Sequence, residues 1–146
     1  MTVREGDLLK SVMSSPVISM ESTGNVAAAA QTMVQHNIGS VVVVEGKKPV
    51  GIITERDITK QVIKGEGVLR GPVKNVMTKA VVTAPPNMPI QEAFELMLRN
   101  KIRRLPIVEN NSIVGIVTEK DLMRWVLRVS YEPNIPKHIK MVLDTQ

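Results

Sequence analysis

Two short segments of the sequence contain the residue types best suited to chemistry, Thr54-Glu-Arg-Asp57 and Thr118-Glu-Lys-Asp121. A carboxylate in this position can accept two hydroxyl hydrogen bonds, and charge-assisted bonds of this kind are about twice as strong as neutral ones. The threonine, where a strand is expected to become a helix, lies beside free backbone N–H groups that favour an anion. Both segments are also capping boxes, in which the threonine caps the helix and the aspartate reaches back. The pattern alone leaves a binding role and a capping role open.

Arg103 and Arg104 are candidates for an anion contact, because they come just before the apolar run at 105–108. Ile52 and Ile116 lie in the apolar runs that lead into the two threonine segments, and they are candidates for the wall of an apolar slot. Long basic side chains are usually solvated, so an ordinary surface pair is the alternative for the two arginines. No acid–base pair, triad or metal cluster accompanies these residues, and we expect a binding protein rather than an enzyme.

The composition argues against several other classes of protein. The 146 residues include no cysteine and only two histidines, so thiol chemistry and a cysteine- or histidine-rich metal site are not expected. The N-terminal stretch lacks the apolar core of a signal peptide, and no apolar stretch approaches the roughly 20 residues of a membrane span. We therefore expect a cytosolic protein with no membrane contact and no cofactor.

The positive charge is concentrated in the second half of the chain. Residues 74–146 carry +4 of the formal net charge of +5. A basic surface attracts anions through its long-range field, so nucleic-acid binding through phosphate contacts is an alternative function. The chain has only three aromatic residues, Phe94, Trp125 and Tyr131, and single-stranded nucleic-acid binders usually stack bases on aromatic side chains. The composition thus argues against stacking but not against phosphate contacts.

The chain repeats itself at an offset of 64 residues without a gap. VMSSPVISM at 12–20 aligns with VMTKAVVTA at 76–84, and NIGSVVVVEGKKPVGIITERDI at 37–58 aligns with KIRRLPIVENNSIVGIVTEKDL at 101–122. Over the 47 positions 12–58, 14 residues are identical. One supersecondary unit is therefore used twice.

Each copy predicts the order strand, helix, strand, strand, helix, which is an α/β (α+β) fold. We expect each first helix to follow a cap, Thr23 or Asn87, and to bury one apolar stripe with the spacing i, i+3, i+4, i+7 and i+8. The expected strands are 16–20, 40–44 and 50–53, then 80–84, 105–108 and 114–117; the expected stripes are Val26, Ala29, Ala30, Met33 and Val34, then Ile90, Ala93, Phe94, Met97 and Leu98. The predicted boundaries are 8–62 and 75–128 for the repeats, 63–74 for a linker and 129–146 for a tail. Two units of this size should share one domain around a pseudo-twofold axis.

The element order, the opening Val-Met-Ser/Thr and the segments GIITERD at 51–57 and GIVTEKD at 115–121 resemble the CBS-domain repeat. Two copies in tandem resemble a CBS pair, also called a Bateman module, over roughly residues 8–128. The resemblance implies a regulatory sensor that binds AMP, ADP, ATP, S-adenosylmethionine or a related ligand in clefts between the repeats. We expect such a sensor to act on a separate partner protein.

A purine nucleotide needs an apolar slot for its base, an acceptor for the ribose diol and positive charge or N–H donors for its phosphates. The resemblance implies one site made of Asp121, Thr118 and Ile116 with Ser14, Ser19, Ile38 and Gly39, and a second made of Asp57, Thr54 and Ile52 with Thr78, Thr83, Ile102 and Arg103. We expect Arg104 near the phosphates of the first site. Because Gly39-Ser40 stands in the first copy where Arg103-Arg104 stands in the second, the two sites should differ.

The closing helix, EKDLMRWVLRVS at 119–130, is apolar around most of its circumference. A helix that packs against one sheet needs an apolar stripe of only about 100°. The excess predicts a second partner surface, and CBS pairs resembling this chain commonly dimerise through their helices, so we expect a homodimer. A purely structural dimerisation module, with clefts that bind nothing, remains the other alternative.

Overall fold

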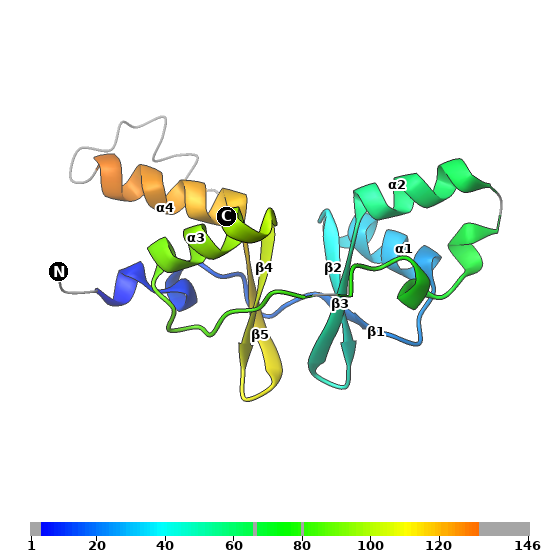
Figure 1. Cartoon of the computed structure of the whole chain (residues 1–146), viewed down its shortest axis with the longest axis horizontal. Helices are drawn as coiled ribbons and strands as arrows, with labels where there is room; N and C mark the ends of the chain where they lie inside the picture. The colour runs from blue at the N-terminus through cyan, green and yellow to red at the C-terminus, as the bar shows by residue number, and fades with distance from the viewer. Residues whose placement is uncertain (1–3, 66, 80, 132–146) are drawn as a thin grey trace.

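A computed structural model describes residues 4–65, 67–79 and 81–131 of the chain. The fold has two lobes, one for each repeat, and the strands of both lobes lie at the centre with the helices toward the two ends (Figure 1). The first lobe contains β1 (Ser19–Glu21), α1 (Val26–His36), β2 (Ser40–Glu45), β3 (Lys48–Thr54) and α2 (Glu55–Lys64); the second contains α3 (Ile90–Asn100), β4 (Arg104–Glu109), β5 (Ser112–Thr118) and α4 (Glu119–Tyr131). The mixed α/β class predicted from the sequence is confirmed.

The strands form a three-stranded sheet, β1-β2-β3, in the first lobe and a two-stranded sheet, β4-β5, in the second. The two hairpins have matching registers, with Val41 opposite Ile53 and Leu105 opposite Val117. The continuous apolar run Val41–Val44 is buried along its whole length, because β2 is the central strand of its sheet. Both hairpins place a Thr-Glu-x-Asp segment where the second strand of the hairpin ends and a helix begins.

The first strand of each repeat is shorter than expected. β1 begins at Ser19, and in place of the strand expected at 80–84 the described residues form a single parallel bridge from Ala84 to Ile107. The pairing of β1 continues through the N–H of Ser22, which donates to the carbonyl of Val44 at 2.9 Å. Its counterpart in the second repeat is Pro86, which has no N–H, so the prediction of a second strand was wrong.

The cap of the first helix in each repeat lies two residues later than expected. The chain still turns at 22–24, and the side chain of Asn25, not Thr23, caps α1 by accepting the N–H of Ala28 at 2.9 Å. The equivalent position before α3 is Pro89 rather than Asn87, and its side chain makes no capping hydrogen bond. Pro89 has φ −60° and ψ 140°, outside the helical region, and its carbonyl accepts the N–H of Ala93 at 3.1 Å, so the first turn of α3 forms without a side-chain cap.

The buried stripes of α1 and α3 are narrower than predicted. Val26, Ala29 and Met33 and their counterparts Ile90, Ala93 and Met97 are buried as expected. The last residues of the predicted stripes are not: Val34 is 84% exposed and Leu98 is 75% exposed. The packing of each helix therefore covers a narrower face than its apolar period predicts, and Val34 and Leu98 at the edge of the stripe face outward.

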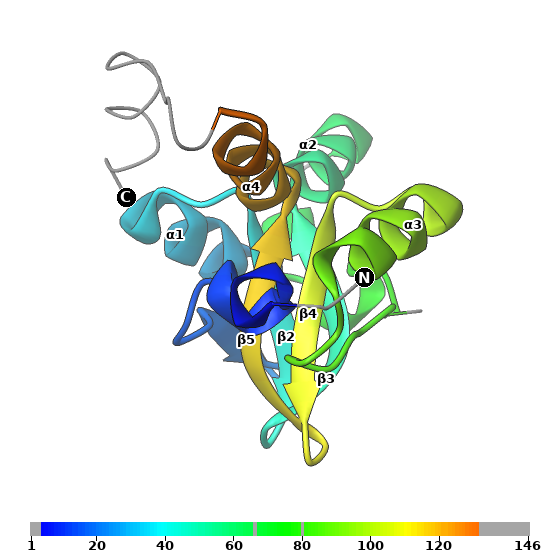
Figure 2. The ribbon, with the colours of Figure 1, turned by 90° about the vertical axis from the view of Figure 1, so that its left-hand side faces the viewer.

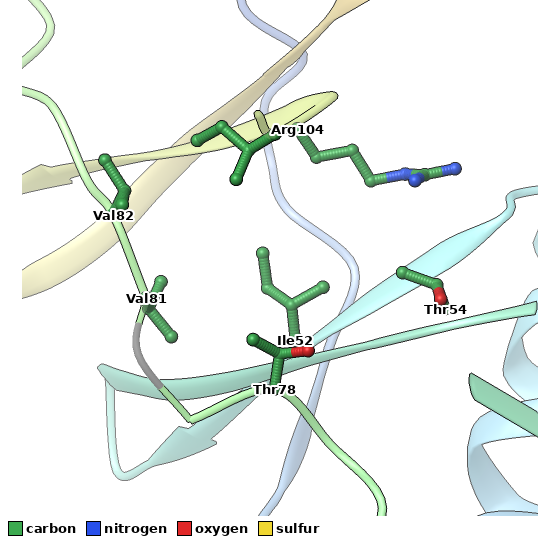
Figure 3. A pocket seen from close by; sticks show the side chains of 7 residues that line it. Ile52, Thr54, Thr78, Val81, Val82 and Arg104 are labelled. Carbon is green, nitrogen blue, oxygen red and sulfur yellow. The ribbon is translucent and has the colours of Figure 1, made fainter. Parts of the chain in front are cut away.

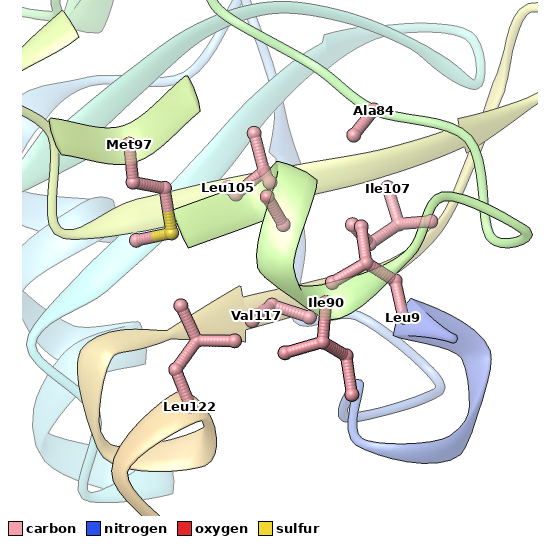
Figure 4. Packing of buried hydrophobic residues seen from close by; sticks show 9 residues of the cluster. Leu9, Ala84, Ile90, Met97, Leu105, Ile107, Val117 and Leu122 are labelled. Atoms are coloured by element: carbon pink, nitrogen blue, oxygen red, sulfur yellow. The ribbon is translucent and has the colours of Figure 1, made fainter. Parts of the chain in front are cut away.

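Each lobe buries a residue that precedes the other repeat's first strand. Leu9 lies in the core of the second lobe, together with Ile90, Leu105 and Val117 (Figure 4). Its counterpart Val73 lies in the core of the first lobe. Backbone hydrogen bonds fix both segments, from Leu9 N–H to the carbonyl of Met88 and from Val73 N–H to the carbonyl of Gly24. This reciprocal exchange joins the repeats into one structural unit.

Short extended segments also bridge the lobes at the centre. Ile52 and Thr78 exchange two backbone hydrogen bonds of 3.0 and 2.8 Å, and Ser14 and Ile116 exchange two of 2.9 and 3.1 Å. Viewed from one end, the strands of the second lobe lie in front of those of the first (Figure 2). The pseudo-symmetric bridges therefore fix the space between the lobes, where the candidate site lies.

Glycines in β3 and β5 allow this close approach. A Cβ atom at Gly51 would overlap the sulfur of Met77, and a Cβ atom at Gly115 would overlap the sulfur of Met13. Each methionine comes from the segment that bridges to the opposite lobe. These glycines therefore serve packing between the repeats.

The closing helix α4 is apolar in more than one direction, as the sequence predicts. Leu122 is buried, and the ring of Trp125 lies 6.5 Å from that of Phe94 on α3. Met123 and Val129 are exposed. Of the predicted tail, residues 132–146 lie outside the described residues. Within 4–65, 67–79 and 81–131, none of the helices has the length and apolar character required to cross a membrane.

Candidate ligand-binding clefts

A cleft of about 420 Å³ lies between the lobes, and we name it the Asp121 cleft. Its volume is within the range of about 300–1,000 Å³ that is typical of small-molecule sites. The lining comes from both lobes: Ser14, Pro16, Val17, Ile18, Asn37, Ile38, Gly39 and Ser40 from one side, and Arg103, Arg104, Ile116, Thr118, Glu119, Lys120, Asp121 and Arg124 from the other. The cleft thus has an apolar side, one buried carboxylate and four basic side chains.

The carboxylate of Asp121 is fixed where β5 becomes α4. Its Oδ2 atom accepts the backbone N–H of Thr118 at 2.8 Å and the hydroxyl of Thr118 at 3.1 Å. Its Oδ1 atom accepts Nη1 of Arg124 at 3.1 Å. The aspartate therefore reaches back to the residue before the helix, as expected of a capping box, and the same aspartate also lines the cleft. The two readings of the motif are compatible.

The basic side chains of the cleft differ in whether a carboxylate pairs with them. Arg124 pairs with Asp121, and Arg103 lies 4.0 Å from the carboxylate of Glu119 with both side chains well exposed. Arg104 is half-buried and makes no ion pair within the described part of the chain. A half-buried guanidinium without a carboxylate partner is well placed to attract an anionic group.

A second cleft of about 130 Å³ lies at the pseudo-symmetric position, and we name it the Ile52 cleft. It is lined by Ile52, Thr54, Thr78, Val81, Val82, Ile102 and Arg104. Val81 and Val82 lie at one end, while the guanidinium of Arg104 extends to the other end, near Thr54 (Figure 3). This cleft is smaller and more apolar than the Asp121 cleft.

Arg104 lines both clefts, and Gly39 makes room for it. A Cβ atom at Gly39 would lie only 3.0 Å from Nη2 of Arg104 and 3.6 Å from the carboxyl carbon of Glu55. Any larger residue at position 39 would press on the guanidinium. The small size of Gly39 and the position of the Arg104 side chain therefore affect how much space remains in the Asp121 cleft and in the Ile52 cleft.

The structure brings together most residues predicted for the first site. Ser14, Ile38, Gly39, Ile116, Thr118 and Asp121 line the Asp121 cleft, together with Arg104. Ile52, Thr54, Thr78 and Ile102 line the Ile52 cleft. These placements agree with the predicted geometry, and the role of each residue in binding stays a prediction.

Four predicted residues lie elsewhere. Ser19 and Thr83 line neither cleft and are exposed, whereas their neighbours Ile18 and Val82 do line clefts. Successive side chains of an extended chain point to opposite sides, which explains both exclusions. Asp57 accepts the same two hydrogen bonds from its threonine as Asp121 does but does not line the Ile52 cleft, and Arg103 lines the Asp121 cleft instead of the Ile52 cleft.

Sequence reasoning missed several lining residues, of which Glu119, Lys120 and Arg124 carry charge. Arg124 follows Asp121 by three residues on a helix, and this spacing is the signal in the sequence that makes the two side chains neighbours. Pro16, Val17 and Ile18 carry no comparable signal, because an irregular segment has no periodicity to follow. Among the described residues, no group of three or more His, Cys, Asp or Glu is placed to hold a metal ion.

The CBS domain family matches residues 9–64 and 73–128. A CBS domain-containing protein of Bacillus subtilis, YhcV, is 38% identical over 114 residues, which are 78% of this chain and 81% of that protein. An uncharacterized protein of Methanopyrus kandleri is 40% identical over 111 residues, which are 74% of this chain but only 57% of that protein. This chain belongs to the CBS domain family and contains two CBS domains in tandem.

Solved structures of CBS pairs have the same fold. The CBS-domain containing protein ATU1752 from Agrobacterium tumefaciens matches with a TM-score of 0.72 and 29% identity, over 80% of this chain and 96% of that chain. The CBS domain pair of protein MJ0100, in complex with 5′-methylthioadenosine and S-adenosyl-L-methionine, matches with a TM-score of 0.74 and 31% identity, over 82% of this chain and 98% of that chain.

Proposed function

We propose that this protein is a regulatory module that binds an adenosine nucleotide in the Asp121 cleft and acts on a partner protein in trans. The composition of that cleft carries the proposal, because a buried carboxylate, an apolar side and four basic side chains share about 420 Å³. A ribose diol needs the first, a purine base the second and phosphates the third. The Ile52 cleft, at about 130 Å³ and with a single basic residue, supports the proposal less well.

The residues of the cleft suggest how each part of the ligand binds. Asp121 accepts hydrogen bonds from the ribose hydroxyls, and Ile38 and Ile116 contact the base. Arg104 faces the phosphates, since it is the half-buried cation without an ion pair in the described part of the chain. The complex of protein MJ0100 supports an adenosine ligand, because both molecules bound there contain adenosine.

Binding between the lobes also suggests how a signal passes to a partner. A ligand that contacts Ile38 and Gly39 on one lobe and Asp121 on the other binds best at one spacing of the lobes. Such a ligand shifts the population toward that spacing and changes the outer surface that a partner contacts. Regulation then needs no catalytic group in the module itself.

We propose in addition that two copies associate through their helices. Val34 on α1 and Leu98 on α3 are equivalent residues of the two repeats, and both are strongly exposed. Met123 and Val129 on α4 are exposed as well. A twofold interface joins the same patch of two copies, and a chain whose pseudo-twofold axis already repeats a patch presents matched surfaces for such contacts. The occupant of these faces is therefore a second copy of the chain.

Calorimetry and thermal unfolding with AMP, ADP, ATP and S-adenosylmethionine test the binding proposal. A ligand at about 100 times its dissociation constant should stabilise the fold by about 2.7 kcal/mol. Asp121→Ala should greatly weaken binding, whereas Asp57→Ala should not, although each substitution removes the two hydrogen bonds that the aspartate accepts from its threonine. The proposal fails if none of the four ligands shifts the melting temperature, or if the two variants weaken binding equally.

The molecular mass in solution tests association. Light scattering or native mass spectrometry should give the mass of a dimer at micromolar concentration. Leu98→Asp should convert the dimer to a monomer, while Glu95→Asp, a conservative change at an exposed position on the same helix, should leave the mass unchanged. A monomer mass for the unaltered chain would contradict the proposal.

A further inference from the structure

Arg124 occupies part of the carboxylate that the proposed ligand needs. Its Nη1 atom lies 3.1 Å from Oδ1 of Asp121, and the side chains of Arg124 and Asp121 are 23% and 10% exposed. Arg124 also lines the Asp121 cleft. The ion pair therefore lies inside the cleft and not on the outer surface.

The hydrogen-bonding capacity of Asp121 limits what can bind without disturbing this pair. An ionised carboxylate has about four acceptor sites. Thr118 uses two of them at Oδ2, and Arg124 uses one at Oδ1. One site remains, whereas a ribose diol that binds through both hydroxyls needs two. A bidentate diol must therefore displace one existing donor.

Among these donors, Arg124 is the one that can leave Asp121 and find a new anionic partner. The backbone N–H of Thr118 is fixed at the start of α4, and the Thr118 hydroxyl has a duplicate in the Thr54–Asp57 box, where it is part of the helix cap. Arg124 instead has a long side chain and three other basic residues of the cleft around it, Arg103, Arg104 and Lys120. A phosphate attracted to this group gives a released guanidinium a new partner.

The first repeat has no equivalent of this arrangement. Lys60 stands at the position that corresponds to Arg124, three residues after Asp57. Lys60 is exposed, lines neither cleft, and forms no ion pair with Asp57 in the described part of the chain. Within the described residues, an ion pair between this aspartate and the basic residue three positions later is therefore found only in the Asp121 cleft.

We propose that Arg124 is a specificity-determining residue that makes the Asp121 cleft prefer phosphorylated adenosine ligands over uncharged ones. A ligand with phosphates displaces Arg124 from Asp121 and binds it again through a phosphate oxygen. A ligand without phosphates has to break the same ion pair and offers nothing in return. This inference rests on the proposed function and adds the class of ligand that the cleft selects.

Replacement of Arg124 by methionine should move the two classes of ligand in opposite directions. Methionine keeps an unbranched apolar stem but provides no charge and no donor. The Kd for adenosine should fall about threefold, because adenosine no longer has to break an ion pair between partly exposed groups, and such pairs are weak. The Kd for ATP should rise about tenfold, because a charge-assisted hydrogen bond is lost. A merely structural role would move both constants the same way.

Two controls separate this exchange from general charge effects. Lys120→Met removes a basic residue of the cleft that forms no ion pair with Asp121, so the Kd for ATP should rise while that for adenosine stays constant. Lys60→Met changes the matched residue outside the cleft, and both constants should stay within twofold of the unaltered chain. Circular dichroism and the melting temperature show whether each variant folds.

Isothermal titration calorimetry measures the Kd of adenosine and of ATP for the unaltered chain and for the three variants. If ATP does not bind the unaltered chain, the preference for phosphorylated ligands is overturned, and the proposed function fails only if AMP, ADP and S-adenosylmethionine do not bind either. If both bind and Arg124→Met weakens both, or changes neither, the proposed function stands and the role of Arg124 is overturned. A selective gain for adenosine together with a loss for ATP supports the inference.

Discussion

The two repeats contain the same Thr-Glu-x-Asp segment, and only one of them has its aspartate in a cleft. Asp57 and Asp121 each accept the N–H and the hydroxyl of the preceding threonine, with distances that agree within 0.1 Å. Yet Asp121 lines a cleft of about 420 Å³, while Asp57 does not line the cleft of about 130 Å³ near its own box. The same hydrogen bonds between threonine and aspartate thus occur in two different sites.

The difference comes from the residues that face each box from the opposite lobe. The first lobe offers Gly39 and Ser40 to the Asp121 cleft, and these small residues leave space. Ile38 and Ile102 are equivalent and identical, but the second lobe offers Arg104 to the Ile52 cleft where the first offers Ser40 to the Asp121 cleft, and the longer side chain takes up space. In both repeats the aspartate of the motif reaches back to the start of a helix. The residues that face it from the opposite lobe determine whether the aspartate also lines a cleft.

The two repeats should unfold as one unit, because each buries a residue that precedes the other. Leu9→Ala tests this, and of the substitutions proposed it should lower the free energy of unfolding most. Leu9 is completely buried in the core of the second lobe although it precedes the first repeat. Removal of a buried leucine should lower the free energy of unfolding by about 2–5 kcal/mol. Chemical denaturation should still show one transition, shifted as a whole. Two separate transitions would mean that the lobes are independent.

Gly39→Leu should close the larger cleft and so make the two sites alike. The new side chain would press on Arg104, since even a Cβ atom would lie 3.0 Å from its guanidinium. The Kd for ATP should rise at least tenfold, about 1.4 kcal/mol, when measured by calorimetry. Arg103→Leu, at the equivalent and exposed position, is the control and should weaken ATP binding only a few-fold. Equal losses would show that space at position 39 does not matter.

The sequence was sufficient for the elements that depend on local pattern and repetition. The apolar runs at 40–44 and 105–108 predicted β2 and β4, and Thr54 and Thr118 marked the start of α2 and α4 within one residue. The offset of 64 residues indicated which positions are equivalent, such as Gly39 and Arg103. These features need no knowledge of how the lobes are placed.

The sequence was insufficient wherever the outcome depends on a contact between distant segments. Val34 and Leu98 fit the apolar period of their helices, but exposure is decided by how wide a face the sheet covers. The missing strand before α3 follows from one proline in the pairing position, Pro86, which a pattern of apolar residues does not reveal. The contrast of Gly39-Ser40 with Arg103-Arg104 predicted that the two sites differ, but the volumes of the clefts required the side chains of both lobes in three dimensions.

Arg104→Ser tests whether the two clefts communicate, with an intermediate effect. Arg104 lines both clefts, so ATP in the Asp121 cleft should draw its guanidinium and perturb the amide signal of Thr78 in the Ile52 cleft. Serine is the residue of the first repeat at this position, and it removes the shared cation. The Kd for ATP should rise several-fold, through one lost charge-assisted bond.

Nuclear magnetic resonance reports the second half of this prediction. On addition of ATP at a saturating concentration, the shift of Thr78 should be present in the unaltered chain and absent in Arg104→Ser. Signals around Asp121 should move in both proteins. A Thr78 shift that persists without Arg104 would show that the clefts communicate through the backbone bridge of Thr78 to Ile52, whose two hydrogen bonds are 2.8 and 3.0 Å long.

The smallest effect is expected for Arg103→Gln, the other arginine of the pair. Arg103 and Glu119 are separated by 4.0 Å, and their side chains are 77% and 66% exposed. Exposed pairs contribute about 0–1 kcal/mol, so the free energy of unfolding should change by less than about 0.5 kcal/mol. ATP affinity should fall slightly at low salt and not at 0.5 M salt, because an exposed charge acts through a screened field. A loss as large as that of Arg104→Ser, and independent of salt, would show that Arg103 contacts the phosphates directly and that burial does not distinguish the two arginines.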